Sequence, residues 1–176
     1  MYYYAIYTTT GKELEYKNFL QKLAPEFTFF FPRRELYIRR KGVTKKEVAP
    51  LYKGYFFLKS KDPIGMEQKN FLEKEFRKHM PESFIKILGE DMENKKVMPL
   101  SSAEVNYIEM LTGGNEIIPS MKLLKEGDEY KVETGPLKGQ KVQIVRVDKR
   151  KKRFVVRAVF LGETREIQLG MDYLSE

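Results

Sequence analysis

The fold is decided by the stretch LYKGYFFLK at residues 51–59, in which aromatic and apolar side chains dominate. Residues of these types favour β-strands. The segment at residues 2–8 has the same aromatic and β-branched character. We therefore expect two strands of one sheet, with neighbouring side chains on opposite faces.

Helical periods alternate with strand-like runs around these two segments. Residues 12–23 and 65–80 place apolar side chains three and four positions apart, which is the spacing of one helix face. The sequence SSAE at residues 101–104 is a capping box and predicts a short helix that ends at Gly113 and Gly114. Further strands are expected at residues 27–31, 35–38 and 84–88. The order predicts an α+β fold, an N-terminal αβ sandwich whose antiparallel sheet is backed by helices.

The character of the chain changes after residue 114. Residues 115–125 contain Pro119 and show no clear period, so we interpret them as a linker. Residues 126–176 consist of short strand-like runs separated by turn signals. Several short strands in about 50 residues predict a small β-barrel that closes its own edges.

The formal net charge is +8 and the pI is about 9.4, a balance typical of proteins with polyanionic partners. On charge alone, a merely basic, soluble protein is an equally good interpretation. Residues 33–46 contain seven basic residues and one acid, and residues 138–157 contain nine and one. These clusters predict two basic surfaces. The candidate nucleic-acid-binding residues are Arg33, Arg34, Arg39, Arg40, Lys41, Lys45 and Lys46 in the first cluster, and Lys149, Arg150, Lys151, Lys152 and Arg153 in the second.

Residue types that carry catalysis are scarce. Cysteine is absent, and the single histidine, His79, lies in a helical segment rich in Lys and Glu, where we expect a solvated residue. The acidic residues 90–93 could hold a hard cation, but a solvated turn is the simpler interpretation. No phosphate-binding glycine motif is present. We therefore expect a binding protein and not an enzyme, without catalytic residues, cofactor or metal.

Neither a signal peptide nor an apolar run near the ~20 residues of a membrane span is found. The prediction is a cytoplasmic protein with no membrane partner.

Several motifs occur in an order that resembles one family. They are YYAI at residues 3–6, GKE at 11–13, FPRR at 31–34, LYKGYF at 51–56 and MPLSSAEV at 98–105, followed by GPLKG at 135–139, VD at 147–148 and LG at 161–162. The first five resemble the N-terminal (NGN) domain of the NusG family of transcription elongation factors. The last three resemble its KOW motif.

This resemblance implies an NGN domain at residues 1–114, a linker at 115–125 and an SH3-like KOW barrel at 126–176. It also implies that the first domain docks an aromatic depression on the clamp helices of the largest RNA polymerase subunit, and that the protein is a monomer. We assign this contact to Tyr3, Tyr4, Tyr52 and Tyr55. From the residues alone, these tyrosines could equally be core, a protein interface or a base-stacking platform.

Departures from the family pattern favour a specialised paralogue. Tyr3 stands where Trp is usual, Lys53 replaces a Pro, and Val142 replaces the usual KOW glycine. Leu161 stands where housekeeping factors carry the Phe that contacts the ribosomal protein NusE, which weakens the expectation of ribosome coupling. The KOW partner surface is expected at Phe160 and Leu161.

The basic turn at residues 148–153 is similar to that of the LoaP group of antiterminators, which act on long operons and recognise nascent RNA. The expected partners are therefore RNA polymerase, nascent RNA and non-template DNA, with NusE or Rho as candidates for the KOW domain.

The alternative functions are a housekeeping factor that couples polymerase to Rho or the ribosome, a structural RNA-binding KOW protein, and a magnesium-dependent nuclease. The basic turn could also be only a solvated hairpin.

Overall fold

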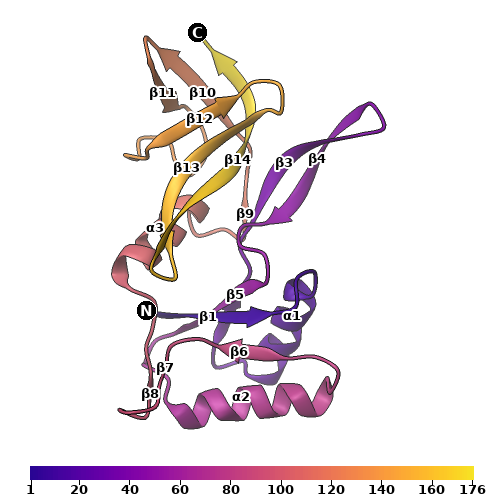
Figure 1. The fold of residues 1–176 in the computed structure, drawn as a ribbon, viewed down its shortest axis with the longest axis vertical. Helices are drawn as coiled ribbons and strands as arrows, with labels where there is room; N and C mark the ends of the chain where they lie inside the picture. The colour runs from indigo at the N-terminus through magenta and orange to yellow at the C-terminus, as the bar shows by residue number, and fades with distance from the viewer. The chain divides into compact units, whose positions relative to one another are not determined.

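The computed structural model describes residues 1–176 and is a mixed α/β structure with three helices and several sheets (Figure 1). The predicted mixture of helices and strands is confirmed. Two compact units divide the chain: unit 1 comprises Met1–Phe31 and Tyr52–Ser101, and unit 2 comprises Pro32–Leu51 and Ser102–Glu176. None of the helices is long and apolar enough to cross a membrane.

Unit 1 is built on a four-stranded sheet in the order β2-β5-β1-β6, in which every neighbouring pair is antiparallel. Its strands are β1 (Tyr2–Thr8), β2 (Thr28–Phe30), β5 (Tyr55–Ser60) and β6 (Ile85–Ile87). The two aromatic runs form the central pair β1 and β5, as predicted. They are central because a strand covered on both faces needs apolar side chains at successive positions.

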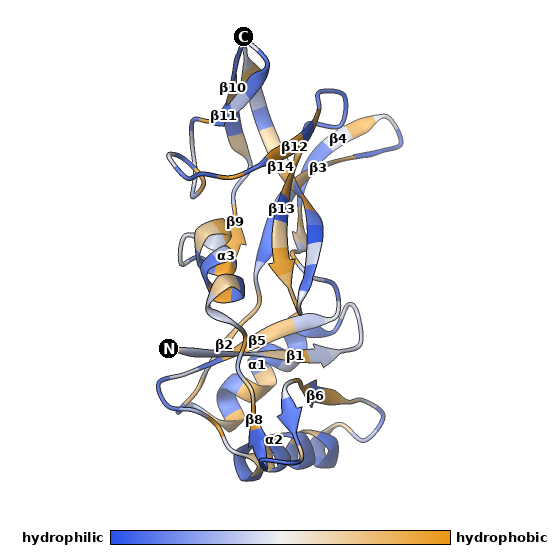
Figure 2. Ribbon diagram, turned by 60° about the vertical axis from the view of Figure 1, so that its left-hand side comes forward, coloured by the Kyte–Doolittle hydropathy of each residue, from blue (hydrophilic) through white to orange (hydrophobic).

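One face of this sheet packs against α1 (Glu13–Leu23) and α2 (Met66–His79). Tyr4, Ile6, Phe56 and Leu58 project from β1 and β5 into this core and are fully buried. Most of α2 is hydrophilic in Figure 2, because only a narrow apolar stripe of that helix faces the sheet. His79, at the end of α2, is exposed, as expected.

The GKE motif has a structural explanation in unit 1. Glu13 is buried, and its carboxylate accepts the N–H of Gly11 at 2.7 Å and the N–H of Gly54 at 2.8 Å. Gly54 has φ +80°, and a Cβ there would lie 3.1 Å from the Thr8 carbonyl oxygen. Glu13 therefore ties the start of α1 to the tight turn that precedes β5.

The acidic residues 90–93 belong to a short ribbon of β7 (Glu90–Asp91) and β8 (Lys96–Val97). Asp91 accepts hydrogen bonds from Asn94, as in a turn. The expected solvated turn is present, because Glu90, Met92 and Glu93 are exposed. Glu90 also forms a 3.4 Å ion pair with Lys69, whose buried ammonium group contacts Glu73 at 3.0 Å.

Unit 2 contains a five-stranded sheet in the order β11-β10-β14-β13-β12. Its strands are β10 (Met121–Glu126), β11 (Glu129–Val132), β12 (Ile144–Asp148), β13 (Arg153–Phe160) and β14 (Glu163–Ser175). Phe154, Val156, Phe160 and Leu169 supply buried side chains from β13 and β14. Helix α3 (Ser102–Thr112) begins at the predicted capping box and contacts β13. In that box, Glu104 accepts the N–H of Gly162 at 3.1 Å.

The interpretation of residues 115–125 as a linker is wrong. These residues contain β9 (Ile117–Ile118) and most of β10. Ile118, Met121 and Leu123 are buried, and β10 pairs in parallel with the distant β14. The pairing with β14 has no local signal, but β10 also forms a hairpin with β11 around Gly127, a local signal that the linker interpretation overlooked.

A long hairpin of β3 (Arg33–Arg40) and β4 (Val43–Pro50) completes unit 2, with β9 parallel to β3. The hairpin lies alongside β14 in Figure 1. The approach is close, since a Cβ at Gly170 of β14 would stand 2.4 Å from the Glu35 carbonyl oxygen. The compact units thus place residues 32–51 with the C-terminal half. The assignment of residues 1–114 to an NGN domain and of residues 126–176 to a KOW domain stays a prediction.

We expect Glu13→Gln to lower the free energy of unfolding by about 2–3 kcal/mol, since an amide loses one charged acceptor and turns a donor toward a backbone N–H. Urea denaturation would measure the change. Glu15→Gln is the matched control on the same helix turn, because Glu15 is exposed and pairs only with Lys12. Equal stability of the two variants would contradict the structural role of Glu13.

Candidate nucleic-acid interface

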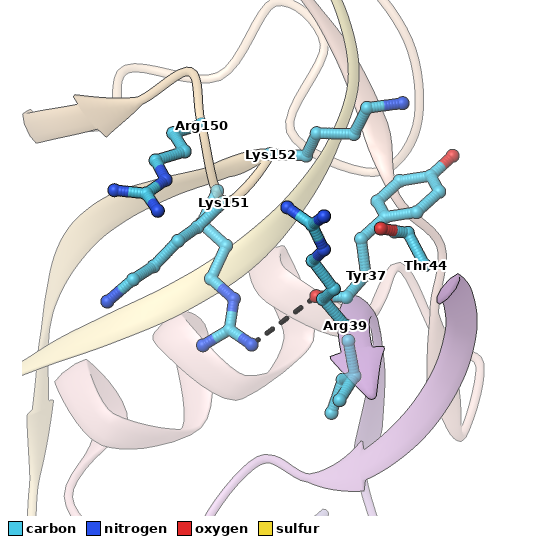
Figure 3. Close-up of a pocket in the computed structure, with 8 residues that line it drawn as sticks. Tyr37, Arg39, Thr44, Arg150, Lys151 and Lys152 are labelled. Carbon is cyan, nitrogen blue, oxygen red and sulfur yellow. Dashed lines mark hydrogen bonds between the residues drawn. The ribbon is translucent and has the colours of Figure 1, made fainter. Parts of the chain in front are cut away.

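The two basic clusters of the sequence meet in unit 2. A groove of about 490 Å³, here called the basic groove, separates the hairpin β3–β4 from the turn between β12 and β13. It is lined by Tyr37, Ile38, Arg39, Thr44, Arg150, Lys151, Lys152 and Arg153. Figure 3 shows Arg39 between Tyr37 on one side and Arg150 and Lys151 on the other, with Lys152 extending toward the Tyr37 ring. The prediction of two separate basic surfaces is therefore wrong for these residues.

The register of the hairpin determines which of its side chains face the groove. Tyr37 pairs with Lys46 and Arg39 pairs with Thr44, so these four side chains share one face of the antiparallel ribbon. Glu35 lies on the same face by alternation. One face of the hairpin thus presents an aromatic ring, three charged groups and a hydroxyl group to the rest of unit 2.

The other wall is the turn at residues 148–152. The Asp148 carboxylate accepts the Lys151 N–H at 2.9 Å, and Lys152 adopts a left-handed backbone with φ +51°. That conformation costs a lysine about 1 kcal/mol relative to glycine. The turn nevertheless carries a cation there, and the Lys152 ammonium lies 4.6 Å from the centre of the Tyr37 ring. A cation over an aromatic face at this distance is an attractive contact.

A polar cluster, here called the hairpin lock, attaches the hairpin to β14. The Tyr37 hydroxyl and the Ser120 hydroxyl each donate to Asp172 Oδ1 at 2.5 Å. The Ser120 N–H donates to Glu35 at 3.1 Å. The Lys46 ammonium lies 3.3 Å from the Asp172 carboxylate and 3.5 Å from that of Glu35. Every polar group of the lock therefore has a partner, which a half-buried cluster requires.

The lock shifts the pKa values of its members. Burial raises the pKa of the Asp172 carboxyl, but hydrogen bonds from Ser120, Tyr37 and Lys46 outweigh burial and leave that pKa below its ordinary value. The hydrogen bond to Asp172 raises the pKa of the Tyr37 hydroxyl. Burial lowers the pKa of Lys46, but Asp172 and Glu35 outweigh it, so that pKa is raised. At neutral pH the carboxylate and the ammonium are both charged.

Several predicted nucleic-acid-binding residues do not line the groove. At the base of the hairpin, Arg33 pairs with Glu116 at 3.5 Å and Arg34 donates to the Leu51 carbonyl oxygen at 2.9 Å. Arg40 pairs with Glu47, and Lys149 pairs with Glu176. Lys46 belongs to the hairpin lock, while Lys41 and Lys45 are exposed toward the hairpin tip. The groove cations Arg39, Arg150 and Lys151 are exposed and form no ion pair.

Sequence reasoning missed Tyr37, Thr44, Ser120 and Asp172. The first two carried a usable signal, because alternation along a strand at residues 33–40 puts Tyr37 on the same face as Arg39. Asp172 and Ser120 are isolated polar residues without a diagnostic spacing. Arg153 was predicted, and its guanidinium group also donates to the Tyr37 carbonyl oxygen at 3.5 Å.

The predicted aromatic depression of unit 1 needs correction at Tyr3, Tyr4 and Tyr52, which are buried. Tyr4 is fully buried among α1 and α2, and its hydroxyl accepts the Ile64 N–H at 3.0 Å. Tyr3 projects to the opposite face because side chains alternate along β1. Tyr4 is therefore a core residue and not part of an exposed surface.

An aromatic face, comprising Tyr3, Tyr7, Phe30, Tyr52, Tyr55 and Phe57, covers the side of the sheet opposite Tyr4. Tyr3 and Tyr52 are 2% and 5% exposed, so their predicted exposure is also wrong. Tyr55 is half-buried. Tyr7 was not among the predicted site residues. It is 42% exposed, and its ring lies 5.2 Å from that of Tyr55 and 5.6 Å from that of Phe84.

The predicted KOW partner surface also needs correction. Phe160 is fully buried, and the Arg165 guanidinium lies 5.0 Å from its ring centre. Phe160 faces inward because it continues the buried alternation of Phe154 and Val156 along β13. Leu161 lies in the turn to β14 with φ +51° and is half-exposed. Only Leu161 remains a candidate contact.

Unit 1 is an α/β unit and unit 2 is β-rich with a cation-lined groove, a surface whose positive charge attracts polyanions. A family model described as "Transcription termination factor nusG" matches residues 1–109. The chain belongs to the NusG family of transcription factors. A comparison with curated protein sequences gives no match.

A solved structure agrees with this fold. The chain is similar to the structure described as "Domain interaction in Thermotoga maritima NusG", with 19% identity, 96% of this chain and 93% of that chain covered, and a TM-score of 0.51. Two structures of an MjSpt4:Spt5 complex match at 16% and 15% identity, covering 93% and 96% of this chain and 90% and 99% of those chains. Their TM-scores of 0.29 and 0.28 are too low to add to the fold comparison.

We expect Asp172→Asn to lower the free energy of unfolding at pH 7 by about 1.5–3 kcal/mol, the usual contribution of hydrogen bonds to a charged group. The folded pKa of Asp172 lies below its unfolded value of about 3.9. The contribution is therefore present above pH ~3.9 and is lost as the pH falls through the folded pKa.

Urea denaturation of wild type and Asp172→Asn, at neutral pH and again below pH ~4, would measure the difference in their free energies of unfolding. Asp62→Asn serves as the control, because Asp62 is exposed and lies in unit 1. A difference between wild type and Asp172→Asn that stays constant over the whole range would contradict the lock.

Proposed function

We propose that this NusG-family chain is an elongation and antitermination factor that binds RNA polymerase and nucleic acid together and keeps transcription processive through pauses and terminators. The observation that carries the proposal is the convergence of two distant basic clusters on one groove. Family membership supplies the transcriptional context. No catalytic role is proposed for any residue, and the protein acts as a monomer in the cytoplasm.

Unit 1 is proposed to contact the clamp helices of the largest polymerase subunit through its aromatic face. The accessible part of that face is Tyr7 and Tyr55, with Phe84 beside them. Tyrosines at a half-exposed sheet position combine a large apolar area with a polar group, which suits a protein interface. A factor that binds the closed clamp more tightly than the open, paused clamp shifts the population toward the transcribing state.

Unit 2 is proposed to contact nucleic acid through the basic groove. Arg39, Arg150 and Lys151 form no ion pair with the protein, so their charges are available to phosphates. Nascent RNA and the non-template DNA strand are the polyanions present at a transcribing polymerase. Neutralising phosphates releases counterions, which drives binding without base readout.

Residues 126–176 are proposed to act as the KOW domain. In the GPLKG motif, Gly135 and Gly139 have φ values of +79° and +75°, and Leu137 is fully buried. These features explain the residue types of the motif. Glycine is needed at the two left-handed backbone positions, and a leucine between them is buried in the core. Binding of NusE or Rho would have to use the half-exposed Leu161, because Phe160 is buried.

A specialised, LoaP-like paralogue recruited by nascent RNA fits these features better than a housekeeping factor. The turn that meets the hairpin carries four consecutive cations, Lys149 to Lys152. Leu161 stands at the position where housekeeping factors carry the Phe expected for ribosome coupling, so this chain lacks that aromatic ring. The groove therefore favours recruitment through RNA over coupling through a ribosomal protein.

We expect the purified protein to increase readthrough of an intrinsic terminator that follows its own leader RNA. The reason is that the complex stabilises the closed clamp while RNA is held in the groove. In vitro transcription with purified polymerase would measure the readthrough fraction. The double variant Tyr7→Ala/Tyr55→Ala should lose polymerase binding and readthrough while still binding RNA.

Tyr2→Ala is the matched control for that variant, because Tyr2 is exposed on the same strand and forms no ring contact with Tyr7 or Tyr55. Unchanged readthrough with wild-type protein in every leader tested would argue against the proposal. RNA binding without any polymerase binding would instead favour a structural RNA-binding protein.

We expect neutralisation of one groove cation, Arg39→Ala or Lys151→Ala, to reduce the slope of log affinity against log salt by about 0.7–0.9. The slope counts the phosphates that the protein neutralises. Lys41→Ala tests whether the hairpin tip also contacts phosphate. Fluorescence anisotropy with a labelled RNA at several salt concentrations would measure each slope.

The control is Lys74→Ala, which removes an exposed lysine from α2 in unit 1. It should leave the slope unchanged. If Arg39→Ala and Lys151→Ala both keep the wild-type salt slope, these two residues do not contact phosphates and belong to solvated loops.

A further inference from the structure

The aromatic ring inside the basic groove is not free to stack on a base. The ammonium groups of Lys152 and Lys46 lie 4.6 and 5.3 Å from the centre of the Tyr37 ring. The Tyr37 hydroxyl is fixed on Asp172. Tyr37 therefore positions cations and holds the hairpin, and a base-stacking residue must lie elsewhere.

A second hollow of about 540 Å³ adjoins the basic groove. Lys152 lines both of them. The second hollow is also lined by Lys149, Met171, Asp172, Tyr173, Leu174 and Glu176. The basic groove therefore leads past Lys152 to a hollow at the end of β14 in which cations and carboxylates are balanced.

Tyr173 is the exposed aromatic residue of this second hollow, with 60% of its area accessible. The pairing of β10 with β14 explains its exposure. Met121 pairs with Met171 and Lys122 pairs with Tyr173, so β14 has one extra residue, Asp172, at this point. An extra residue in a strand redirects the neighbouring side chains. Asp172 is thereby placed in the hairpin lock, and Tyr173 is left at the surface.

We propose that the surface formed by the basic groove and Tyr173 binds an unpaired stretch of nucleic acid, with one base stacked on the Tyr173 ring. This inference rests on the proposed function and specifies its ligand. A cationic track followed by an exposed aromatic ring is the arrangement that binds single strands, because the phosphates follow the cations and every base has a face to stack. A duplex keeps its bases stacked on each other and offers none to Tyr173.

The charges fit this division of roles. Arg39, Arg150 and Lys151 supply cations on the groove side of Lys152. On the Tyr173 side, Lys149 is paired with Glu176, so its charge is already compensated. The phosphate contacts are therefore concentrated in the groove, and the contact at Tyr173 is with a base.

The test uses the full chain and three labelled probes of about 12 nucleotides, within the range of known single-strand sites: single-stranded RNA, single-stranded DNA and an RNA duplex. We expect either single strand to bind more tightly than the duplex. Tyr173→Ala should weaken single-strand binding about 5- to 100-fold and leave the duplex affinity unchanged. Tyr173→Phe, which keeps the ring, should bind like wild type.

Two further readouts separate stacking from charge. A 2-aminopurine base in the single-stranded probe should be quenched by wild type and not by Tyr173→Ala. The salt slope should be unchanged in Tyr173→Ala but reduced by about 0.7 in Lys152→Ala. Tyr2→Ala controls for loss of an exposed tyrosine, and circular dichroism checks that each variant is folded.

The inference is overturned if the duplex binds as tightly as the single strands and Tyr173→Ala has no effect. In that case, if Arg39→Ala and Lys151→Ala still lower the salt slope, the proposed function is still supported. If no probe binds wild type and no terminator is read through, the proposed function itself fails. Preference for RNA over DNA assigns the ligand to the transcript, the reverse assigns it to the displaced DNA strand, and both support a single-strand site.

Discussion

The Asp172 carboxylate is the centre on which the candidate interface depends. It accepts hydrogen bonds from Tyr37 and Ser120 and lies 3.3 Å from the Lys46 ammonium. These contacts hold the hairpin against β14, at a point where Gly170 allows the backbones to approach closely. Bringing two basic clusters together is otherwise unfavourable, because like charges repel. Asp172 and Glu35 lie among the cations and offset part of that repulsion.

Much of the fold was predictable because its signals are local. The aromatic runs at residues 2–8 and 51–59 became β1 and β5, and the helical periods became α1 and α2. Residues 115–125 were only partly predictable in this way, since β10 pairs locally with β11 but also with β14, which is distant in the sequence. The basic clusters were likewise visible, but their meeting was not. It depends on Ser120, Gly170 and Asp172, which carry no recognisable pattern.

The aromatic residues of β1 show that a correctly predicted strand does not tell which of its side chains enter the core. Tyr3 and Tyr4 are adjacent, and alternation guarantees that only one of them enters the core with α1 and α2. Composition does not decide which one. The decision comes from the register with β5, where Tyr4 pairs with Leu58, Tyr3 with Lys59 and Tyr7 with Tyr55. Cross-strand pairing therefore separates the core from the aromatic face and identifies Tyr7 as part of that face.

The hairpin lock also links binding to folding. A polyanion in the basic groove would neutralise the repulsion between Arg39 and the turn cations, and so favour the docked hairpin over an undocked one. By reciprocity, each contact that keeps the hairpin docked raises the affinity for the polyanion, because the cations are already in place. Asp172 and Tyr37 therefore influence nucleic-acid binding without touching a phosphate. This separates their role from that of Arg39 or Lys151, whose charges would meet the ligand directly.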